Sequence, residues 1–118
     1  MPGAVVEGLD HLQLAMPAGG EGSARAFYGG VLGLTELPKP AELAARGGVW
    51  FALGVQALHL GVETPFVPAR KAHPAFAVSD VETCRAHLQA SGVETVPDTT
   101  LGHVRRLYAA DPFGNRLE

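Results

Sequence analysis

Three histidines and one glutamate are the residues of this sequence whose types and spacing could do chemistry together. His11, His59 and His73 each lie in a run of alternating apolar and polar or small residues. Glu118 ends a shorter run that follows the turn-forming sequence Asp-Pro-Phe-Gly-Asn at residues 111–115. Successive side chains of a strand point to opposite faces, so each of the four falls opposite the large apolar residues of its own strand.

The spacing of these residues indicates an internal repeat. Three pairs of residues are separated by nearly the same number of positions. The separation is 62 between His11 and His73, and it is 59 between Gly33 and Gly92 and again between His59 and Glu118. Such a match predicts a tandem duplication within a single domain spanning residues 1–118. We expect one module at about residues 5–64 and a second at about 72–118, joined by the proline-containing linker 64–72. Where their concave faces meet, the four side chains would converge in one cleft.

Each module is predicted to contain a strand, a helix and three further strands, which is an α+β architecture. In the first module the expected strands are residues 7–16, 34–37, 49–53 and 56–63, with a helix from Ser23 to the stop at Gly33. In the second module the expected strands are residues 73–78, 93–96, 104–109 and 116–118. A capping-box sequence at residues 79–82 predicts the start of the second helix, and Ser91-Gly92 its end.

Composition excludes several classes of protein. The chain has 118 residues, of which 47% are hydrophobic and 18% charged, as in a globular domain. The formal charge of −3 offers no basic patch for nucleic acid, and no apolar run approaches the length of a membrane span. A single cysteine excludes an internal disulfide, and residues 1–4 lack signal-peptide features, so we expect a cytoplasmic protein.

Three motifs resemble those of the vicinal oxygen chelate superfamily. They are Leu9-Asp10-His11-Leu12, Ala26-Phe27-Tyr28 with Leu32-Gly33-Leu34, and Asp111-Pro112-Phe113-Gly114-Asn115-Arg116-Leu117-Glu118. This superfamily includes glyoxalase I, bleomycin-resistance proteins, fosfomycin-resistance thiol transferases, methylmalonyl-CoA epimerase and extradiol dioxygenases. The resemblance implies paired βαβββ modules that form a curved sheet around a central cleft. It also implies a divalent metal at the positions of His11, His59, His73 and Glu118.

Imidazole nitrogens and a carboxylate oxygen suit Zn, Ni, Fe, Mn or Co without choosing among them. A metal in such a site would leave room for a substrate with two adjacent oxygens, with Glu118 available as the catalytic base. His59 stands where glyoxalase I-like members usually carry a carboxylate and epimerase-like members a glutamine, so the reaction stays open.

Four further residues are expected to bind the substrate. Gln13 shares a face with His11, while Arg106 and Tyr108 share the cleft face of their strand, with Phe51 as the counterpart in the first module. Arg106 could bind a carboxylate or phosphate, or could form a surface ion pair. His87 and His103 are expected at the surface, and Cys84 is expected in the core.

Two hypotheses from different classes follow. The first is a metal-dependent enzyme of the lyase, isomerase or transferase type that acts on a small oxygen-chelating molecule. The second is a metal-free protein of the bleomycin-resistance type that binds an aromatic or cationic compound between Trp50, Phe51 and Tyr108. We expect a homodimer, and the linker is long enough for one site to take its ligands from one chain or from two.

Overall fold

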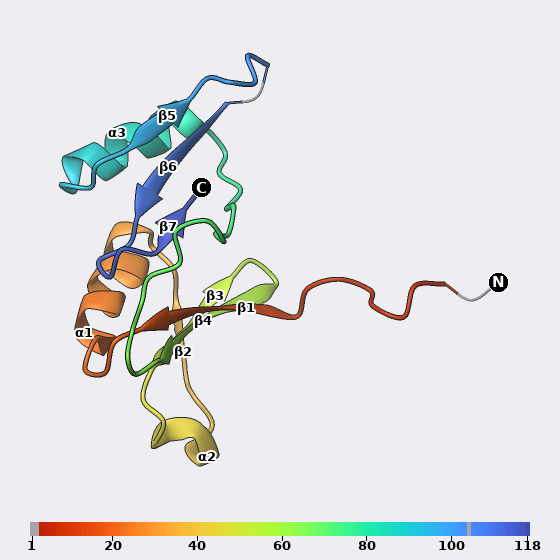
Figure 1. Cartoon of the computed structure of the whole chain (residues 1–118), viewed down its shortest axis with the longest axis vertical. Coiled ribbons are helices and arrows are strands. Elements are labelled where there is room, and N and C mark those ends of the chain that lie inside the picture. Colours follow the sequence, from red (N-terminus) through yellow and green to blue (C-terminus); the bar gives the residue numbers. More distant parts are fainter. Residues whose placement is uncertain (1–2, 104) are drawn as a thin grey trace.

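The computed structural model describes residues 3–103 and 105–118, and it divides into two halves that each combine a sheet with a helix (Figure 1). The N-terminal half comprises residues 11–62 and the C-terminal half residues 73–118. Val104, the first residue of one predicted strand, lies outside the described residues, as do Met1 and Pro2. No helix in the described ranges is long and apolar enough to cross a membrane.

The N-terminal half contains a four-stranded sheet in the order β1-β4-β3-β2. The strands are β1 (His11–Met16), β2 (Glu36–Leu37), β3 (Val49–Leu53) and β4 (Gln56–Val62). β1 runs parallel to β4, whereas β3 is antiparallel to both β4 and β2. β1 therefore lies at an edge of the sheet, and its residue Gln13 pairs with His59.

The first helix packs on one face of this sheet. It begins as α1 (Glu21–Ala24) and continues as a π-helix, η1 (Arg25–Val31), a widening that the sequence pattern did not reveal. Phe27 and Tyr28 from this helix join the strand leucines in the core. The helix ends as predicted near Gly33, whose φ of 75° is the left-handed conformation that glycine adopts without strain. A short helix, α2 (Ala41–Ala44), connects β2 to β3.

The C-terminal half contains α3 (Val81–Ala90) and a three-stranded sheet of β5 (Val96–Asp98), β6 (Arg106–Ala110) and β7 (Arg116–Leu117). Asp80 caps α3 by accepting a hydrogen bond from the Thr83 amide at 2.9 Å. The predicted strand 73–78 is not a regular strand. Its backbone nevertheless bonds to Glu118, since the Phe76 amide donates to the Glu118 carbonyl and the Glu118 amide donates to the Pro74 carbonyl, at 2.8 and 3.0 Å.

The Asp-Pro-Phe-Gly-Asn turn joins the two halves. Asp111 is 5% exposed and accepts a 2.7 Å hydrogen bond from the hydroxyl of Tyr28. Asn115 is 1% exposed and donates to the carbonyl of Ala15 in β1, at 2.8 Å. Burial and the neighbouring Asp111 raise the pKa of Tyr28, so the phenol stays a donor. These buried bonds fix how the halves are oriented, because breaking one leaves an unsatisfied polar group in the core.

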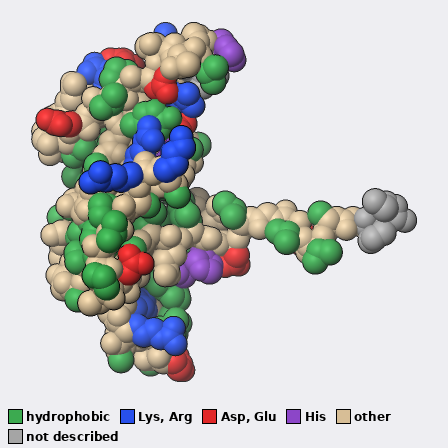
Figure 2. Space-filling view, viewed as in Figure 1, with side chains coloured by type: hydrophobic (Ala, Val, Ile, Leu, Met, Phe, Trp, Pro, Cys, Tyr) green, Lys and Arg blue, Asp and Glu red, His purple; other side chains and the backbone are tan. Residues whose placement is uncertain are grey.

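Residues 3–10 precede β1 and form an extended segment, which we call the arm. It points away from the body of the protein in both views (Figures 1 and 2). The side chains of Val5, Val6 and Leu9 on this segment are largely exposed.

Candidate functional site

The four predicted metal ligands form two pairs, one in each half. Among residues 3–103 and 105–118, no three His, Cys, Asp or Glu side chains lie close enough to hold a metal ion together. The expectation that all four converge in one cleft is therefore not met within one chain. His11 pairs with His59 on the N-terminal sheet, and His73 pairs with Glu118 in the C-terminal half.

The N-terminal pair is part of a column of stacked rings. The imidazoles of His11 and His59 stack with their centroids 4.3 Å apart and an angle of 23° between their planes. On its other side His59 stacks on Trp50 at 3.9 Å and 2°. The backbone register explains the second contact, because Trp50 on β3 lies opposite His59 on β4.

His59 is 8% exposed, and its environment favours the neutral ring. Burial lowers the pKa of His59, and the adjacent His11 and Lys39 lower it further against the opposing effect of Asp10. A neutral imidazole is the form that binds a metal ion.

The ring of His11 is oriented by a carboxylate. Its Nδ1 lies 2.9 Å from Asp10 Oδ1 and must donate to it, which in a neutral ring leaves the lone pair on Nε2. Metal-binding histidines commonly use this arrangement, in which an oxygen holds one ring nitrogen so that the other can ligate. Asp10 was not among the residues singled out from sequence, although it directly precedes a predicted ligand.

His73 has a comparable arrangement. Its Nδ1 lies 2.7 Å from the carbonyl oxygen of Lys71 and must donate to it. Its Nε2 lies 3.1 Å from Glu118 Oε1, with both side chains about one-fifth exposed. With Nδ1 donating, a neutral ring directs a lone pair at a carboxylate oxygen. Two acceptors at this distance require a proton or a cation between them.

The two pairs occupy the same backbone register. In the N-terminal half Gln13, two residues after His11, pairs with His59. In the C-terminal half the two bonds around Glu118 make Ala75, two residues after His73, its parallel partner. The repeat seen in the sequence therefore reappears as an equivalent pairing of two strands.

Two predicted substrate-binding residues of the N-terminal half lie on different faces. Gln13 is exposed on the His11 face, where its side chain lies over Gly61; a Cβ there would be 2.7 Å from the Gln13 amide nitrogen. The placement of Phe51 in the cleft is wrong. Phe51 is 1% exposed and packs in the core beside Tyr28, because alternation on β3 turns Trp50 to the open face.

Tyr108 and Arg106 share a face of β6, as expected from their spacing. The ring of Tyr108 meets His73 edge-on, with 5.5 Å between centroids. Arg106 forms an ion pair with Asp98 at 2.9 Å. The sequence analysis missed Arg116, whose guanidinium lies 4.1 Å from the centre of the Tyr108 ring. Its position two residues before Glu118 was the signal, since alternation gives both side chains one face.

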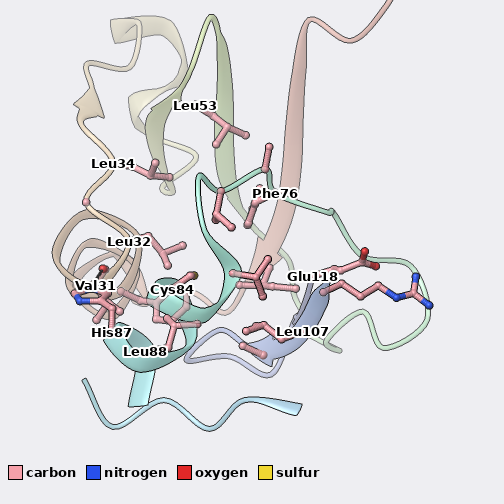
Figure 3. A pocket seen from close by; sticks show the side chains of 18 of the residues that line it. Val31, Leu32, Leu34, Leu53, Phe76, Cys84, His87, Leu88, Leu107 and Glu118 are labelled. Atoms are coloured by element: carbon pink, nitrogen blue, oxygen red, sulfur yellow. Dashed lines mark hydrogen bonds between the residues drawn. The ribbon is translucent and has the colours of Figure 1, made fainter. Parts of the chain in front are cut away.

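An apolar cavity of about 550 Å³ lies between the helix of the N-terminal half and the core face of the C-terminal half. Figure 3 shows Val31, Leu34 and Leu53 directed towards the same space as Phe76 and Leu107. A second cavity, of about 400 Å³, separates β1 from residues 67–74 and is lined by both Gln13 and His73.

His87, Cys84 and His103 take no part in either pair. His87 is exposed and its Nε2 lies 2.7 Å from the Val31 carbonyl, which adds a contact between the halves. Cys84 is half-buried beside the larger cavity, and His103 is exposed in the loop before β6.

Residues 8–118 match the family model described as the Glyoxalase/Bleomycin resistance protein/Dioxygenase superfamily. A crystal structure described as a glyoxalase family protein from Bacillus anthracis is 47% identical, with a TM-score of 0.94 over 99% of this chain and 95% of that one. No curated protein sequence matches the chain.

Two more distant crystal structures share the fold. The fosfomycin resistance protein FosX from Listeria monocytogenes is 18% identical with a TM-score of 0.73, over 96% of this chain and 91% of that one. Lactoylglutathione lyase from Agrobacterium tumefaciens is 23% identical with a TM-score of 0.67, over 98% and 91%. The predicted α+β fold of this superfamily is confirmed.

Proposed function

Because the chain belongs to the glyoxalase/bleomycin resistance protein/dioxygenase superfamily, we propose that it is a divalent-metal-dependent enzyme acting on a small substrate with adjacent oxygen atoms. His11 and His59 of one copy, with His73 and Glu118 of a second copy, would hold the metal ion.

The observation that carries this proposal is the contact between His73 and Glu118. Nε2 of His73 and a Glu118 oxygen are 3.1 Å apart, while Nδ1 of the same ring donates to the Lys71 carbonyl. A metal cation could bind both of these atoms at once, because imidazole nitrogen and carboxylate oxygen are both ligands for Zn, Ni, Fe, Mn and Co. His11, with its Nδ1 on Asp10, offers a free Nε2 in the same way.

A second copy would complete the site, because buried hydrogen bonds hold the halves of one chain in an orientation that keeps the two pairs separate. The Tyr28–Asp111 and Asn115–Ala15 hydrogen bonds and the contact of His87 with Val31 hold the present orientation. Bringing the two pairs together within one chain would require the halves to move relative to each other. That movement would break these buried hydrogen bonds, and each broken bond would cost about 1–3 kcal/mol. Pairing with another copy leaves them intact and completes two sites per dimer.

The residues around the pairs suit proton transfer and substrate binding. Glu118 is the carboxylate of the set, and one-fifth of its side chain is open to solvent, so it can exchange a proton with a substrate. Tyr108 and Arg116 lie beside it with a guanidinium suited to an anionic substrate group. A divalent ion in this site would supply positive charge for a substrate oxygen that becomes negative.

Metal analysis of the purified protein tests the proposal. We expect about one Zn, Ni, Fe, Mn or Co ion per chain, and loss of that ion in His73→Ala. The proposal is wrong if chain purified without chelator contains no metal and its melting temperature does not change in any of these ions.

Mixing His11→Ala with His73→Ala tests whether a site takes ligands from two chains. Each variant alone should bind metal more weakly than the wild type at both sites. In a mixed dimer one site lacks both residues and the other has all four, so wild-type affinity should return at half of the sites. No recovery in a proven mixed dimer would place all four ligands in one chain.

A metal-free binding protein is the second candidate, and the column of stacked rings favours it. Trp50, His59 and His11 form a flat stack, and Tyr108 carries Arg116 on its face, as a site for planar or charged compounds would require. Binding of an aromatic cation to metal-free protein, unaffected by Glu118→Gln, would support this function over the enzyme.

A further inference from the structure

The arm, residues 3–10, exposes apolar side chains with almost nothing to cover them. Val5, Val6 and Leu9 are 99%, 76% and 71% exposed, and the segment points away from the body of the protein (Figures 1 and 2). One hydrogen bond, from Gln56 Nε2 to the Leu9 carbonyl at 2.8 Å, links it to β4. Apolar side chains in such a position favour burial against another surface.

The C-terminal half carries a matching unpaired strand edge. The backbone groups of Pro74 and Phe76 point towards β7, where they bond to Glu118. The backbone groups of Ala75 and Ala77 point the opposite way, because the direction alternates along an extended chain. Among the described residues they have no backbone partner, and both residues are exposed. A free edge of this kind accepts an added strand.

We propose that the arm of one copy pairs as an antiparallel strand with the free edge of residues 74–78 in a second copy. This inference rests on the proposed function, in which His11 of one chain meets His73 of the other. β1 and residues 73–78 are equivalent strands of the repeat, and a two-fold relation makes such strands run antiparallel. The residues before His11 then run beside the residues after His73.

The faces of the two strands agree with this pairing. Paired strands have the same two faces, and residues separated from His11 by an odd number of positions lie on the face opposite to it. In the proposed pairing the arm continues the alternation of β1, which would place Val6 on the same face as Phe76 and Val78. These two residues line the apolar cavity, and Val78 is 47% exposed. Val6 of the arm covers this apolar edge, whereas Leu9 lies on the face of the metal ligands.

Sedimentation of the full chain tests the arm. Val6→Asp should raise the dimer dissociation constant at least about tenfold, because it places a charge against Val78. Val55→Asp is the matched control, since Val55 is fully exposed at a hairpin tip outside the arm. This control should stay within about twofold of the wild type. Equal melting temperatures of the diluted monomers would show that both variants fold.

Amide hydrogen exchange, resolved by NMR, locates the pairing. In the wild-type dimer the amides of Ala75 and Ala77 should be protected, and Val6→Asp should abolish that protection. The Phe76 amide, bonded to Glu118, is an internal control that stays protected in both proteins. A wild-type monomer, or a dimer with unprotected Ala75 and Ala77 amides and no response to Val6→Asp, would overturn the inference.

Metal content separates this inference from the proposed function. A dimer that Val6→Asp weakens but that never takes up metal keeps the arm pairing and overturns the metal site. A metal-binding dimer whose dissociation constant does not change with Val6→Asp keeps the metal site and overturns the arm pairing.

Discussion

His11 and His59 are held by ring stacking, whereas His73 and Glu118 face each other as hydrogen-bonding groups. Both pairs lie at the same register of parallel strands. The two halves therefore share the backbone pairing of these residues but differ in the side chains that surround them. The N-terminal half offers nitrogen donors beside Trp50, and the C-terminal half contributes the negative charge. In the proposed enzyme, this difference would give acid–base chemistry to the C-terminal half.

Removing the connection between the halves should have the largest effect. Asp111 accepts four hydrogen bonds, from the amides of Phe113 and Asn115, the Asn115 side chain and the Tyr28 hydroxyl. Asp111→Ala should lower the free energy of unfolding by about 3–5 kcal/mol in chemical denaturation, because buried donors lose their acceptor.

Glu36→Gln is the control for Asp111→Ala. Glu36 accepts two hydrogen bonds from Arg25 on an exposed part of the surface. Its replacement should cost less than about 1 kcal/mol. Similar losses for the two variants would mean that the Asp-Pro-Phe-Gly-Asn turn does not hold the halves together.

Glu118→Gln removes the negative charge that distinguishes the C-terminal pair from the N-terminal pair. Metal affinity measured by titration calorimetry should fall by about 100-fold or more, because the set loses its charged donor and a negative charge. His11→Ala should cost less, about tenfold, since Glu118 and two histidines remain. Glu42→Gln on α2, an exposed carboxylate that belongs to neither pair, should leave affinity unchanged. Equal losses for Glu118→Gln and His11→Ala would contradict the assigned division.

The lowered pKa of His59 predicts a pH dependence in metal-free protein. The folded chain binds a proton at His59 less readily than the unfolded chain, so stability is fully present above about pH 6.5 and declines as the pH falls below it. Thermal unfolding in chelator should show this decline, and His59→Gln should reduce it. A variant with the same slope as the wild type would rule out His59 as its source.

Tryptophan fluorescence gives the smallest but most local readout. Trp50 is the single tryptophan of the chain and stacks on His59 at 3.9 Å. In metal-free protein His59→Ala should change its emission, whereas Glu118→Gln should leave it unchanged. A response to Glu118→Gln alone would show that the two pairs are not separate in solution.

Much of the fold was predictable because it depends on local patterns. Alternation identified β1, β3 and β4, and glycine placed the end of the first helix. The same alternation was misapplied at β3, where Phe51 was assigned to the cleft although it faces the core. Two adjacent aromatic residues suit either face, and only packing against Tyr28 decides between them. Residues 73–78 resemble a strand in sequence, but among residues 3–103 and 105–118 their second edge has no backbone partner.

The repeat and the four residues at its equivalent positions were predictable from the sequence, because strand periodicity and turn chemistry act over a few residues. The arrangement of these residues as two pairs was not predictable in this way. That outcome depends on the orientation of the halves, which buried hydrogen bonds between residues far apart in the chain, such as Tyr28 and Asp111, hold in place. The ring column on Trp50 and the contact between His73 and Glu118 arise only from that packing.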